Sequence, residues 1–264
     1  MSRVELDAVA FAFDGADAPR PRDVAVEAPV NVVYGARPYA VMMTTPADLE
    51  DFAYGFTVTE GVVTDAAFIK GVQVLERARG VELVVTLRAD APRHPLRERS
   101  LSGRTGCGLC GVTSLEQLPM VKAQGLAGVD VSLPAVRAAL AALEAQQPLN
   151  GLTRAVHAAA WCSAGGTLEQ VREDVGRHNA LDKLIGARLR AGLPPGEGFL
   201  LLTSRCSYEL VDKAAAYGAR TIVTISAPTS FAVERARAHD MTLLAVARRD
   251  GVLAFHGAER VRRA

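Results

Sequence analysis

Short apolar runs alternate with turn residues along the first ninety positions of the chain. The runs rich in β-branched and aromatic residues predict strands, and they lie at residues 30–34, 39–44, 71–75 and 81–87. Apolar residues at positions 49, 52, 53 and 56 have helical spacing, which predicts a helix capped by Thr45 and ended by Gly61. The first twenty residues are rich in Asp, Ala and Pro and are expected to be irregular. This part of the chain therefore predicts an α+β unit.

The second half of the chain repeats a strand–helix pattern. The predicted strands are residues 155–162, 168–172, 199–203, 221–226, 243–247 and 252–255. The predicted helices are residues 134–144 with Ser132 as the cap, 179–189, 207–218 and 229–238. Several of the strands are continuous apolar runs rather than alternating ones. Such runs are typical of a largely buried sheet with helices on its faces, so this half predicts an α/β domain.

Residues 88–106 differ from both halves. They contain five arginines together with Pro92, Pro95 and Gly103, and they show no periodic apolar pattern. We interpret them as a basic connector that ends at a cysteine-containing loop. The predicted domains are therefore an N-terminal α+β domain with its connector at residues 1–104 and an α/β domain at residues 105–264.

The charge balance excludes some broad classes of function. The 264 residues contain 30 Lys and Arg against 29 Asp and Glu, so the chain is almost neutral. A nearly neutral protein has no general field for nucleic acid or for an acidic membrane, and any anion site must be local. No apolar run approaches the length of a membrane span, and the N-terminal residues lack the apolar core of a signal peptide. We therefore expect a cytoplasmic protein whose four cysteines are thiols.

The sharpest chemical feature is the loop Gly106-Cys107-Gly108-Leu109-Cys110-Gly111. Glycines before, between and after the cysteines make the backbone permissive, so both sulfur atoms could reach an external partner. The arginines that precede the loop favour a thiolate, which is the nucleophilic form. Three chemistries fit such a pair: a persulfide carrier, a dithiol–disulfide couple, or half of a zinc site.

The zinc and redox alternatives have less support in the sequence. Zinc needs two further ligands, and there is no second Cys-x-x-Cys, although His157 or His178 could complete a site in space. A thioredoxin-like motif is expected in an early strand–helix–strand unit, whereas this one follows a long connector. We expect no structural metal. Cys162 follows Trp161 at the end of an apolar strand and is interpreted as a buried, inert thiol. Cys206, between Arg205 and Ser207 at a strand-to-helix turn, could be reactive, but the non-catalytic interpretation is preferred.

Three further clusters could bind an anion. Arg177, His178 and Asn179 fall in the first turn of a predicted helix, where backbone amides attract anions, although a helix cap with a solvated polar face explains them equally well. Residues 203–205, ending in Arg205, follow an apolar strand, where ligands bind in open α/β sheets. Residues 246–251 contain two arginines beside a tight turn, which could hold phosphate or form an ordinary charged hairpin. No dinucleotide-binding glycine motif or P-loop is present.

Taken in order along the chain, these residues resemble the FdhD family, the accessory sulfurtransferases of formate dehydrogenases. The matching segments are residues 41–61, 103–111, 157–161, 173–178, 204–209 and 226–248. The resemblance implies a cytidine-deaminase-like three-layer C-terminal domain with a smaller N-terminal α+β domain, without the zinc signature of true deaminases. It also implies a cytoplasmic protein and suggests a homodimer.

The resemblance further implies a reaction and a set of residues for it. A sulfur atom would pass from a cysteine desulfurase, as a persulfide, to bis-molybdopterin guanine dinucleotide before that cofactor enters formate dehydrogenase. Cys107 would carry the persulfide and Cys110 would be its partner. The cofactor-binding stretch would comprise Val246, Ala247, Arg248, Arg249, Asp250 and Gly251, to which Arg205 and His178 are added from the clusters above. Val246 stands where relatives often have Phe, and Cys206 where they usually have a small residue. The alternatives are a cofactor-binding chaperone that moves no sulfur and a zinc or dithiol redox protein.

Overall fold

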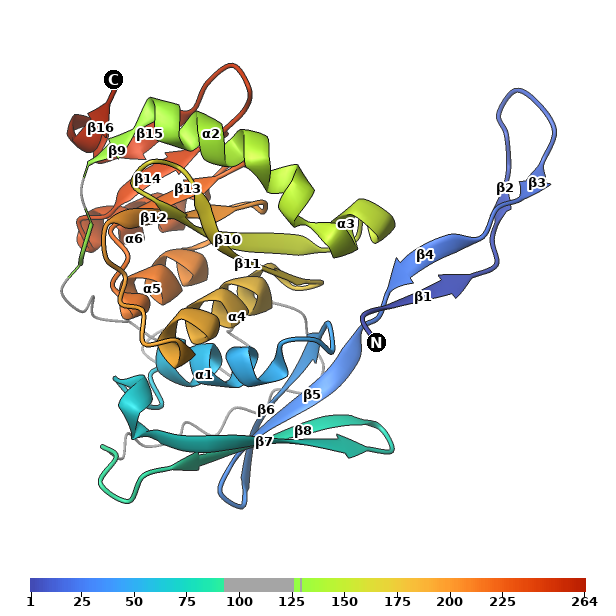
Figure 1. Cartoon of the computed structure of the whole chain (residues 1–264), viewed down its shortest axis with the longest axis horizontal. Helices are drawn as coiled ribbons and strands as arrows, with labels where there is room; N and C mark the ends of the chain where they lie inside the picture. The colour runs from blue at the N-terminus through green and yellow to red at the C-terminus, as the bar shows by residue number, and fades with distance from the viewer. Residues whose placement is uncertain (93–125, 129) are drawn as a thin grey trace.

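In the computed structural model, which describes residues 1–92, 126–128 and 130–264, a six-stranded sheet forms the centre of the C-terminal part (Figure 1). Its strands lie in the order β11 (Leu168–Asp174), β10 (His157–Ser163), β12 (Gly198–Leu202), β13 (Thr221–Thr224), β14 (Thr242–Ala245) and β15 (Leu253–His256). β10 is antiparallel to β11 and β12, whereas β12, β13 and β14 are parallel to one another. β15 returns antiparallel to β14. The six predicted strands are confirmed.

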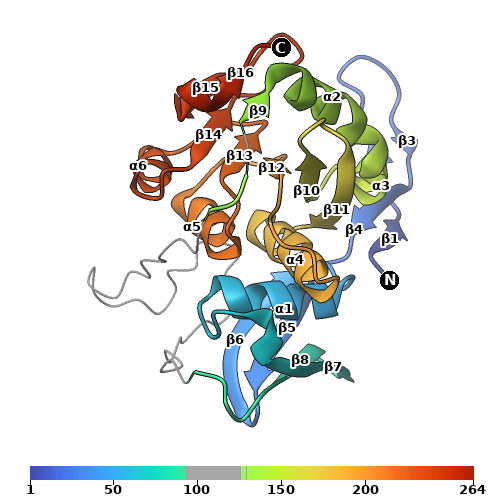
Figure 2. The ribbon, with the colours of Figure 1, turned by 60° about the vertical axis from the view of Figure 1, so that its left-hand side comes forward.

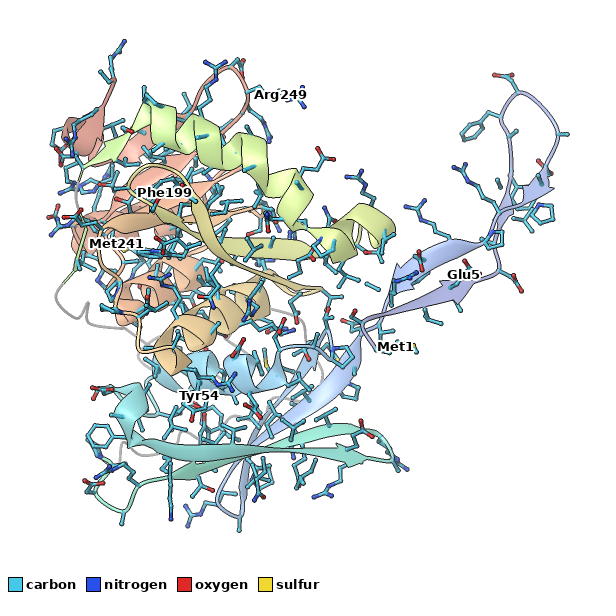
Figure 3. All side chains as sticks on the ribbon, viewed as in Figure 1. Met1, Glu5, Tyr54, Phe199, Met241 and Arg249 are labelled. Atoms are coloured by element: carbon cyan, nitrogen blue, oxygen red, sulfur yellow. The ribbon has the colours of Figure 1, made fainter. Side chains whose placement is uncertain are left out.

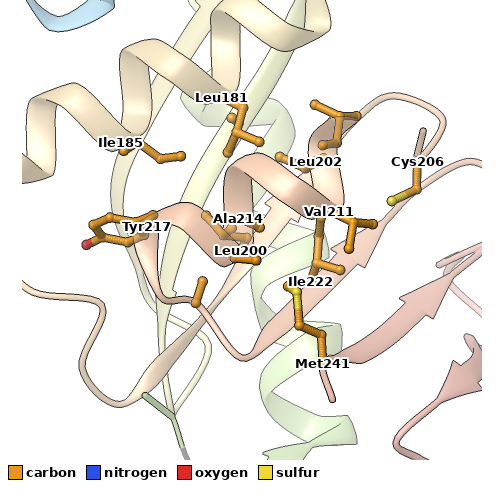
Figure 4. Packing of buried hydrophobic residues seen from close by; sticks show 14 of the residues in the cluster. Leu181, Ile185, Leu200, Leu202, Cys206, Val211, Ala214, Tyr217, Ile222 and Met241 are labelled. Atoms are coloured by element: carbon orange, nitrogen blue, oxygen red, sulfur yellow. The ribbon is translucent and has the colours of Figure 1, made fainter. Parts of the chain in front are cut away.

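Helices cover both faces of this sheet and give it three layers (Figures 1 and 2). α4 (Arg177–Arg190), α5 (Tyr208–Tyr217) and α6 (Ser230–Ala238) pack on one face, and α2 (Leu133–Leu143) packs on the other. Leu200 and Leu202 of β12 belong to the core beneath α4 and α5, which Figure 4 shows from close by. Phe199 and Leu201 of the same strand belong to the core beneath α2. Burial on both faces explains why this strand is apolar at every position.

The N-terminal part is a four-stranded sheet covered by one helix. Its strands lie in the order β6 (Arg37–Thr44), β5 (Ala28–Tyr34), β8 (Gly80–Leu87) and β7 (Ile69–Arg77), and the helix is α1 (Leu49–Thr59). A short 3-10 helix, η1 (Ala66–Phe68), leads into β7. Phe52, Ala53 and Phe56 of α1 share a core with Val30 and Leu83 of this sheet. The predicted α+β unit is confirmed.

The two parts meet where α1 crosses α4, so α1 lies between the N-terminal sheet and α4 (Figure 1). The helices approach closely because each presents a glycine to the other. A side chain on Gly55 would overlap the carbonyl group of Asp182, and one on Gly186 would overlap that of Asp51. Charged groups cross the same interface: Arg172 donates to Asp51 at 2.8 Å, and Arg190 also pairs with Asp51.

A buried lysine joins the two parts further along α1. Lys213 of α5 lies 2.9 Å from Glu60 Oε1 and 2.9 Å from Asp182 Oδ2, and it donates to Thr59 Oγ1 at 2.9 Å. All three groups around the ammonium accept hydrogen bonds, and two of them are carboxylates, so these interactions offset the desolvation penalty of the buried charge. The boundary predicted after residue 104 lies outside the described residues and stays a prediction.

The first residues are not irregular, and that prediction is wrong. β1 (Arg3–Leu6) pairs with β4 (Arg22–Ala25), and β2 (Val9–Ala10) pairs with β3 (Ala18–Pro19). The resulting ribbon extends from the body, with Met1 near its base and Glu5 along it (Figure 3). The prediction failed because it was made from composition, and Ala and Pro are poor strand formers. The strands of the ribbon form because each pairs with a partner strand.

Smaller elements complete the fold. β9 (Val131–Ser132) pairs with β16 (Val261–Arg262), and the 3-10 helices are η3 (Glu144–Gln146) and η4 (Ala258–Arg260). Ser132 caps α2 as predicted, since its hydroxyl accepts from the Ala135 amide at 3.2 Å. α3 (Pro148–Thr153) was not predicted; the Glu173 carboxylate accepts from the amides of its first turn at 2.8 and 2.9 Å. No helix in the described residues is long and apolar enough to span a membrane.

Candidate functional site

The carboxyl ends of four strands meet at one edge of the six-stranded sheet. β11 and β12 are both antiparallel to β10, so they run in the same direction, and β13 and β14 are parallel to β12. The segments that follow these strands therefore lie side by side. They include the start of α4, residues 203–207, residues 225–229 and residues 246–251. This is the edge at which open α/β sheets bind ligands.

Asp174 fixes the start of α4 at this edge. Its Oδ1 accepts from the Gly176 amide at 2.7 Å and from the Asn179 side chain at 3.0 Å, and its Oδ2 lies 2.6 Å from Lys183 Nζ. Asn179 is thus committed to structure rather than to a ligand. Thr45 does not cap α1 as predicted, because its hydroxyl oxygen accepts from the Val175 amide at 3.1 Å instead, while its own amide donates to Asp174 Oδ2 at 2.9 Å. α1 begins later, after Asp48, whose φ is 52°.

His178 lies in the first turn of α4, as predicted, and is 5 % exposed. Its Nε2 is 3.2 Å from the Ser207 hydroxyl oxygen at the cap of α5 and 3.8 Å from Glu209 Oε2. Burial lowers the pKa of His178, and the charge of Arg177 lowers it further, against the opposing effect of Glu209. His178 Nδ1 has no hydrogen-bond partner among the residues that the structure describes.

His157 begins β10 and pairs in register with Asp174. Its Nδ1 is 3.5 Å from Thr203 Oγ1, and that hydroxyl accepts from the Ala158 amide at 2.9 Å. Burial lowers the pKa of His157, and the charges of Arg177 and Arg205 lower it further. The positive charges of both guanidinium groups therefore disfavour protonation of this imidazole. Arg177 follows β11 and Arg205 follows β12, so the two charges come from different strand–helix junctions.

The predicted cofactor-binding stretch follows β14 at the same edge. Val246 has a φ of 54°, a left-handed conformation that is an outlier for a β-branched residue. Its amide donates to the carbonyl oxygen of Ser226 at 3.2 Å. The amide of Cys206 donates to the carbonyl oxygen of the next residue in that loop, Ala227, also at 3.2 Å. The loop after β13 therefore lies between Cys206 and Val246. This arrangement places the Arg205 cluster and the 246–251 stretch on either side of one short loop.

The turn that follows is tight and open to solvent. Arg248 donates its amide to Gly251 at 2.7 Å, and the side chains of Arg248, Arg249 and Asp250 are exposed. Arg249 is labelled on this loop in Figure 3. The predicted turn at residues 250–251 is confirmed. The contact of this stretch with a cofactor stays a prediction.

The cysteines fall into two groups. Cys107 and Cys110, the predicted catalytic pair, lie outside the described residues. Cys162 and Cys206 are both buried in the core, as interpreted from the sequence, and burial raises the pKa of Cys206 to about 12 and that of Cys162 well above its ordinary range. A thiol with so high a pKa is a poor nucleophile near neutrality.

Some residues of this edge were not predicted from the sequence. Arg205 and His178 were predicted, and Val246 to Gly251 were too. The roles of Ser207 and Glu209 beside His178 were missed, because the contact joins the first turns of two helices 29 residues apart in the chain. His157 was considered only as a zinc ligand, and among the described residues no group of three metal-binding side chains is found.

A family model described as the FdhD/NarQ family matches residues 25–262. The chain belongs to this family. The FdhD/NarQ match covers every strand of the six-stranded and the four-stranded sheet, and it begins at the last residue of the N-terminal ribbon, Ala25. The resemblance inferred from the short motifs is thereby confirmed.

Individual FdhD/NarQ relatives agree with this assignment. A protein of Cupriavidus necator named sulfur carrier protein FdhD is 46% identical over 84% of this chain and 78% of its own length. One of Bordetella petrii with the same name is 41% identical over 90% of this chain and 86% of its own length. The crystal structure of a candidate formate dehydrogenase accessory protein from Desulfotalea psychrophila has the same fold, with a TM-score of 0.79 at 23% identity over 99% of this chain and 100% of that one.

Proposed function

We propose that this chain is a sulfur carrier for formate dehydrogenase and acts as a sulfurtransferase. The observation that carries the proposal is membership of the FdhD/NarQ family, together with relatives at 41–46% identity that are named sulfur carriers. The glycine-flanked pair Cys107 and Cys110 supplies the chemistry that such a carrier needs. The donor is a cysteine desulfurase, the place of action is the cytoplasm, and the working unit is a homodimer.

The loading step follows from thiol–disulfide chemistry. The Cys107 thiolate attacks the outer sulfur of the donor's persulfide, a new sulfur–sulfur bond forms, and the donor cysteine leaves as a thiolate. Cys162 and Cys206 cannot compete for this step, since both are buried and protonated. Cys110 is the nearest thiol in sequence and acts as the partner of Cys107.

The cargo is bis-molybdopterin guanine dinucleotide, which binds as a substrate at the carboxyl edge of the six-stranded sheet. Two observations support this site. Arg205 and Arg248 both follow strands that end at this edge, and they flank the same loop after β13. Because the protein is almost neutral overall, a phosphate-rich ligand needs such placed cations. The order and layering of the sheet also suit the cytidine-deaminase-like fold that the resemblance implies.

Sulfur transfer is tested by mass measurement after incubation with a cysteine desulfurase and cysteine. A mass increase of one sulfur on wild type, absent from Cys107→Ala and present in Cys162→Ala, is the expected result. A wild-type protein that gains no sulfur but still activates formate dehydrogenase would favour the chaperone alternative. Formation of a disulfide instead would favour the redox alternative.

The cargo site is tested by calorimetric titration of GDP, which represents the nucleotide half of the cargo. A charge-assisted hydrogen bond contributes roughly 1.5–3 kcal/mol, so Arg248→Ala should bind GDP about ten- to a hundredfold more weakly. Arg237→Ala is the matched control, since this exposed arginine lies in the last turn of α6, at the opposite edge of the sheet. Equal affinities of wild type and Arg248→Ala would remove Arg248 from the site.

A further inference from the structure

The N-terminal ribbon extends from the body and has two different faces (Figure 3). Val4 lies opposite Val24 in its register, and Leu6 is two residues further along β1, so these three side chains share one face. That face is uncovered, with 40% of Val4, 49% of Leu6 and 38% of Val24 exposed. A two-stranded ribbon is only marginally stable by itself in water, so a further strand beside it would stabilise it.

One edge of the ribbon is free. Among the described residues β1 pairs only with β4, and β4 is the strand that contacts α3 (Figure 1). The Val26 amide donates to the carbonyl oxygen of Ser2 at 2.9 Å, and the carbonyl oxygen of Ala8 accepts in the same way at 2.7 Å. Because backbone groups alternate in direction along a strand, Arg3 and Glu5 direct their amides and carbonyl groups to the free edge. Such an edge is a template for pairing with another strand.

The charged face of the ribbon lacks a cation. Arg3 forms an ion pair with Asp23 of β4. Glu5 lies directly opposite Asp23 in the register, and its carboxylate has no ion pair or hydrogen bond with any residue that the structure describes. Like charges that lie directly opposite each other destabilise a pair of strands. A third strand that brought a cation to Glu5 would therefore stabilise the ribbon.

We propose that the free edge of β1 pairs antiparallel with β1 of a second copy of this chain, giving a continuous sheet in the order β4-β1-β1-β4. Within β1 only Arg3 and Glu5 direct backbone groups outward, so these residues form the hydrogen-bonded pairs of the new ladder. A register that places Glu5 opposite the partner's Glu5, or Arg3 opposite the partner's Arg3, sets like charges against each other. The register that places Arg3 opposite the partner's Glu5 forms an attractive pair on each side of the two-fold axis and gives each Glu5 its cation.

The same register suits the apolar face. It places Val4 opposite the partner's Val4 on the axis as a non-hydrogen-bonded pair, in which the Cα atoms are about 4.5 Å apart. Leu6 is then a diagonal neighbour of the partner's Val4, within reach of its side chain. Charge and apolar pattern therefore agree on one self-complementary register, as an interface between two identical chains requires. This interface rests on the proposed function only for the number of copies, and it does not depend on sulfur transfer.

The dimer dissociation constant of the full chain, measured by sedimentation velocity over a range of concentrations, tests the interface. In Glu5→Arg the new guanidinium lies opposite Asp23 of its own ribbon but opposite the partner's Arg3 in the dimer. The ribbon should therefore be retained, whereas the dissociation constant should rise about ten- to a hundredfold, since two attractive pairs become two repulsive ones. Glu76→Arg is the matched control, because it makes the same charge change at an exposed position of β7, the edge strand of the four-stranded sheet. It should match wild type.

Cross-linking tests the register. In Val4→Cys the introduced thiols face each other across the axis at a separation that a disulfide can bridge, so air oxidation should link two chains covalently. Val24→Cys is the control on the same face, with similar exposure. Its thiols would be three strand spacings apart, about 14 Å, and should not link. Peptide mass mapping distinguishes the introduced link from any disulfide of Cys107 or Cys110.

The outcomes separate this interface from the proposed function. A wild-type protein that stays monomeric, or a dimer whose dissociation constant is unchanged in Glu5→Arg, would overturn the interface. Equal cross-linking of Val4→Cys and Val24→Cys would overturn the register. Sulfur loading is measured by mass on the wild-type protein and does not depend on these variants. Normal loading by a dimer that ignores Glu5→Arg would leave the carrier and remove the interface. Failure to load, together with the expected loss of the dimer in Glu5→Arg, would leave the interface on a protein that is not a sulfur carrier.

Discussion

The contact between α1 and α4 makes a specific prediction about two glycines. A Cβ atom on Gly55 would lie 2.7 Å from the carbonyl carbon of Asp182 and 2.9 Å from the amide nitrogen of Gly186, and it would overlap the Asp182 carbonyl oxygen. Because all of these are backbone atoms, no side chain can rotate away to make room. We expect Gly55→Ala to force the two helices apart.

The magnitude follows from two opposing effects. Overpacking a well-packed site costs about 1–3 kcal/mol and occasionally more, and a backbone clash belongs at the upper end of that range. Alanine favours a helix interior over glycine by about 1 kcal/mol, which offsets part of this loss. The net loss of unfolding free energy in Gly55→Ala should therefore be about 2 kcal/mol. Gly186→Ala should behave alike, since its Cβ would lie 2.7 Å from the Gly55 amide nitrogen.

Gly151 provides the matched control. It lies in α3, and a Cβ atom there would meet nothing within 4 Å. Gly151→Ala should be neutral or stabilising by up to about 1 kcal/mol, because only the helix propensity changes. Urea unfolding curves of the three variants, followed by circular dichroism, measure the difference. A Gly55→Ala protein as stable as Gly151→Ala would refute the close approach of α1 and α4.

Three further predictions concern charge, thiols and metal. Lys213→Met should lower the unfolding free energy by about 3–5 kcal/mol, since it leaves Asp182 buried without its cation. Combining Lys213→Met with Asp182→Asn should recover part of this loss in the same urea unfolding assay. Because the pKa of Cys206 is raised to about 12, only about one in 10⁴ of its thiols is ionised at pH 8. A thiolate-specific reagent should therefore label Cys206 only after the protein unfolds. Rapid labelling of the native protein, measured by mass, would contradict the burial of this thiol. Protein purified without chelator should contain no stoichiometric zinc, and one zinc per chain that is lost on mutation of Cys107 or Cys110 would revive the zinc alternative.

Much of the fold could be predicted because the signals are local. The continuous apolar run at residues 199–203 predicted a strand that is buried on both faces, and the structure confirms β12 between α2 and α4. Ser132 predicted the cap of α2 through the ordinary side-chain hydrogen bond. The N-terminal ribbon was missed because its strands are stabilised by pairing with each other and not by their own composition. Thr45 was misassigned because the partner of its hydroxyl oxygen, the Val175 amide, is 130 residues away.

The amino-acid sequence by itself indicated which residues are candidates for the chemistry. The glycine-flanked cysteines, the arginines after strand ends and the polar first turn of α4 are all local patterns, and together they identified the family. Only the tertiary structure decided which of them meet. Strand order brings the ends of β11, β12 and β14 to one edge, and it places His157 beside Thr203 and His178 beside Ser207 although these residues are distant in the chain. Such neighbours depend on the pairing of strands, which no local pattern specifies, and this is the physical reason why the contacts of the two histidines became visible only in the folded protein.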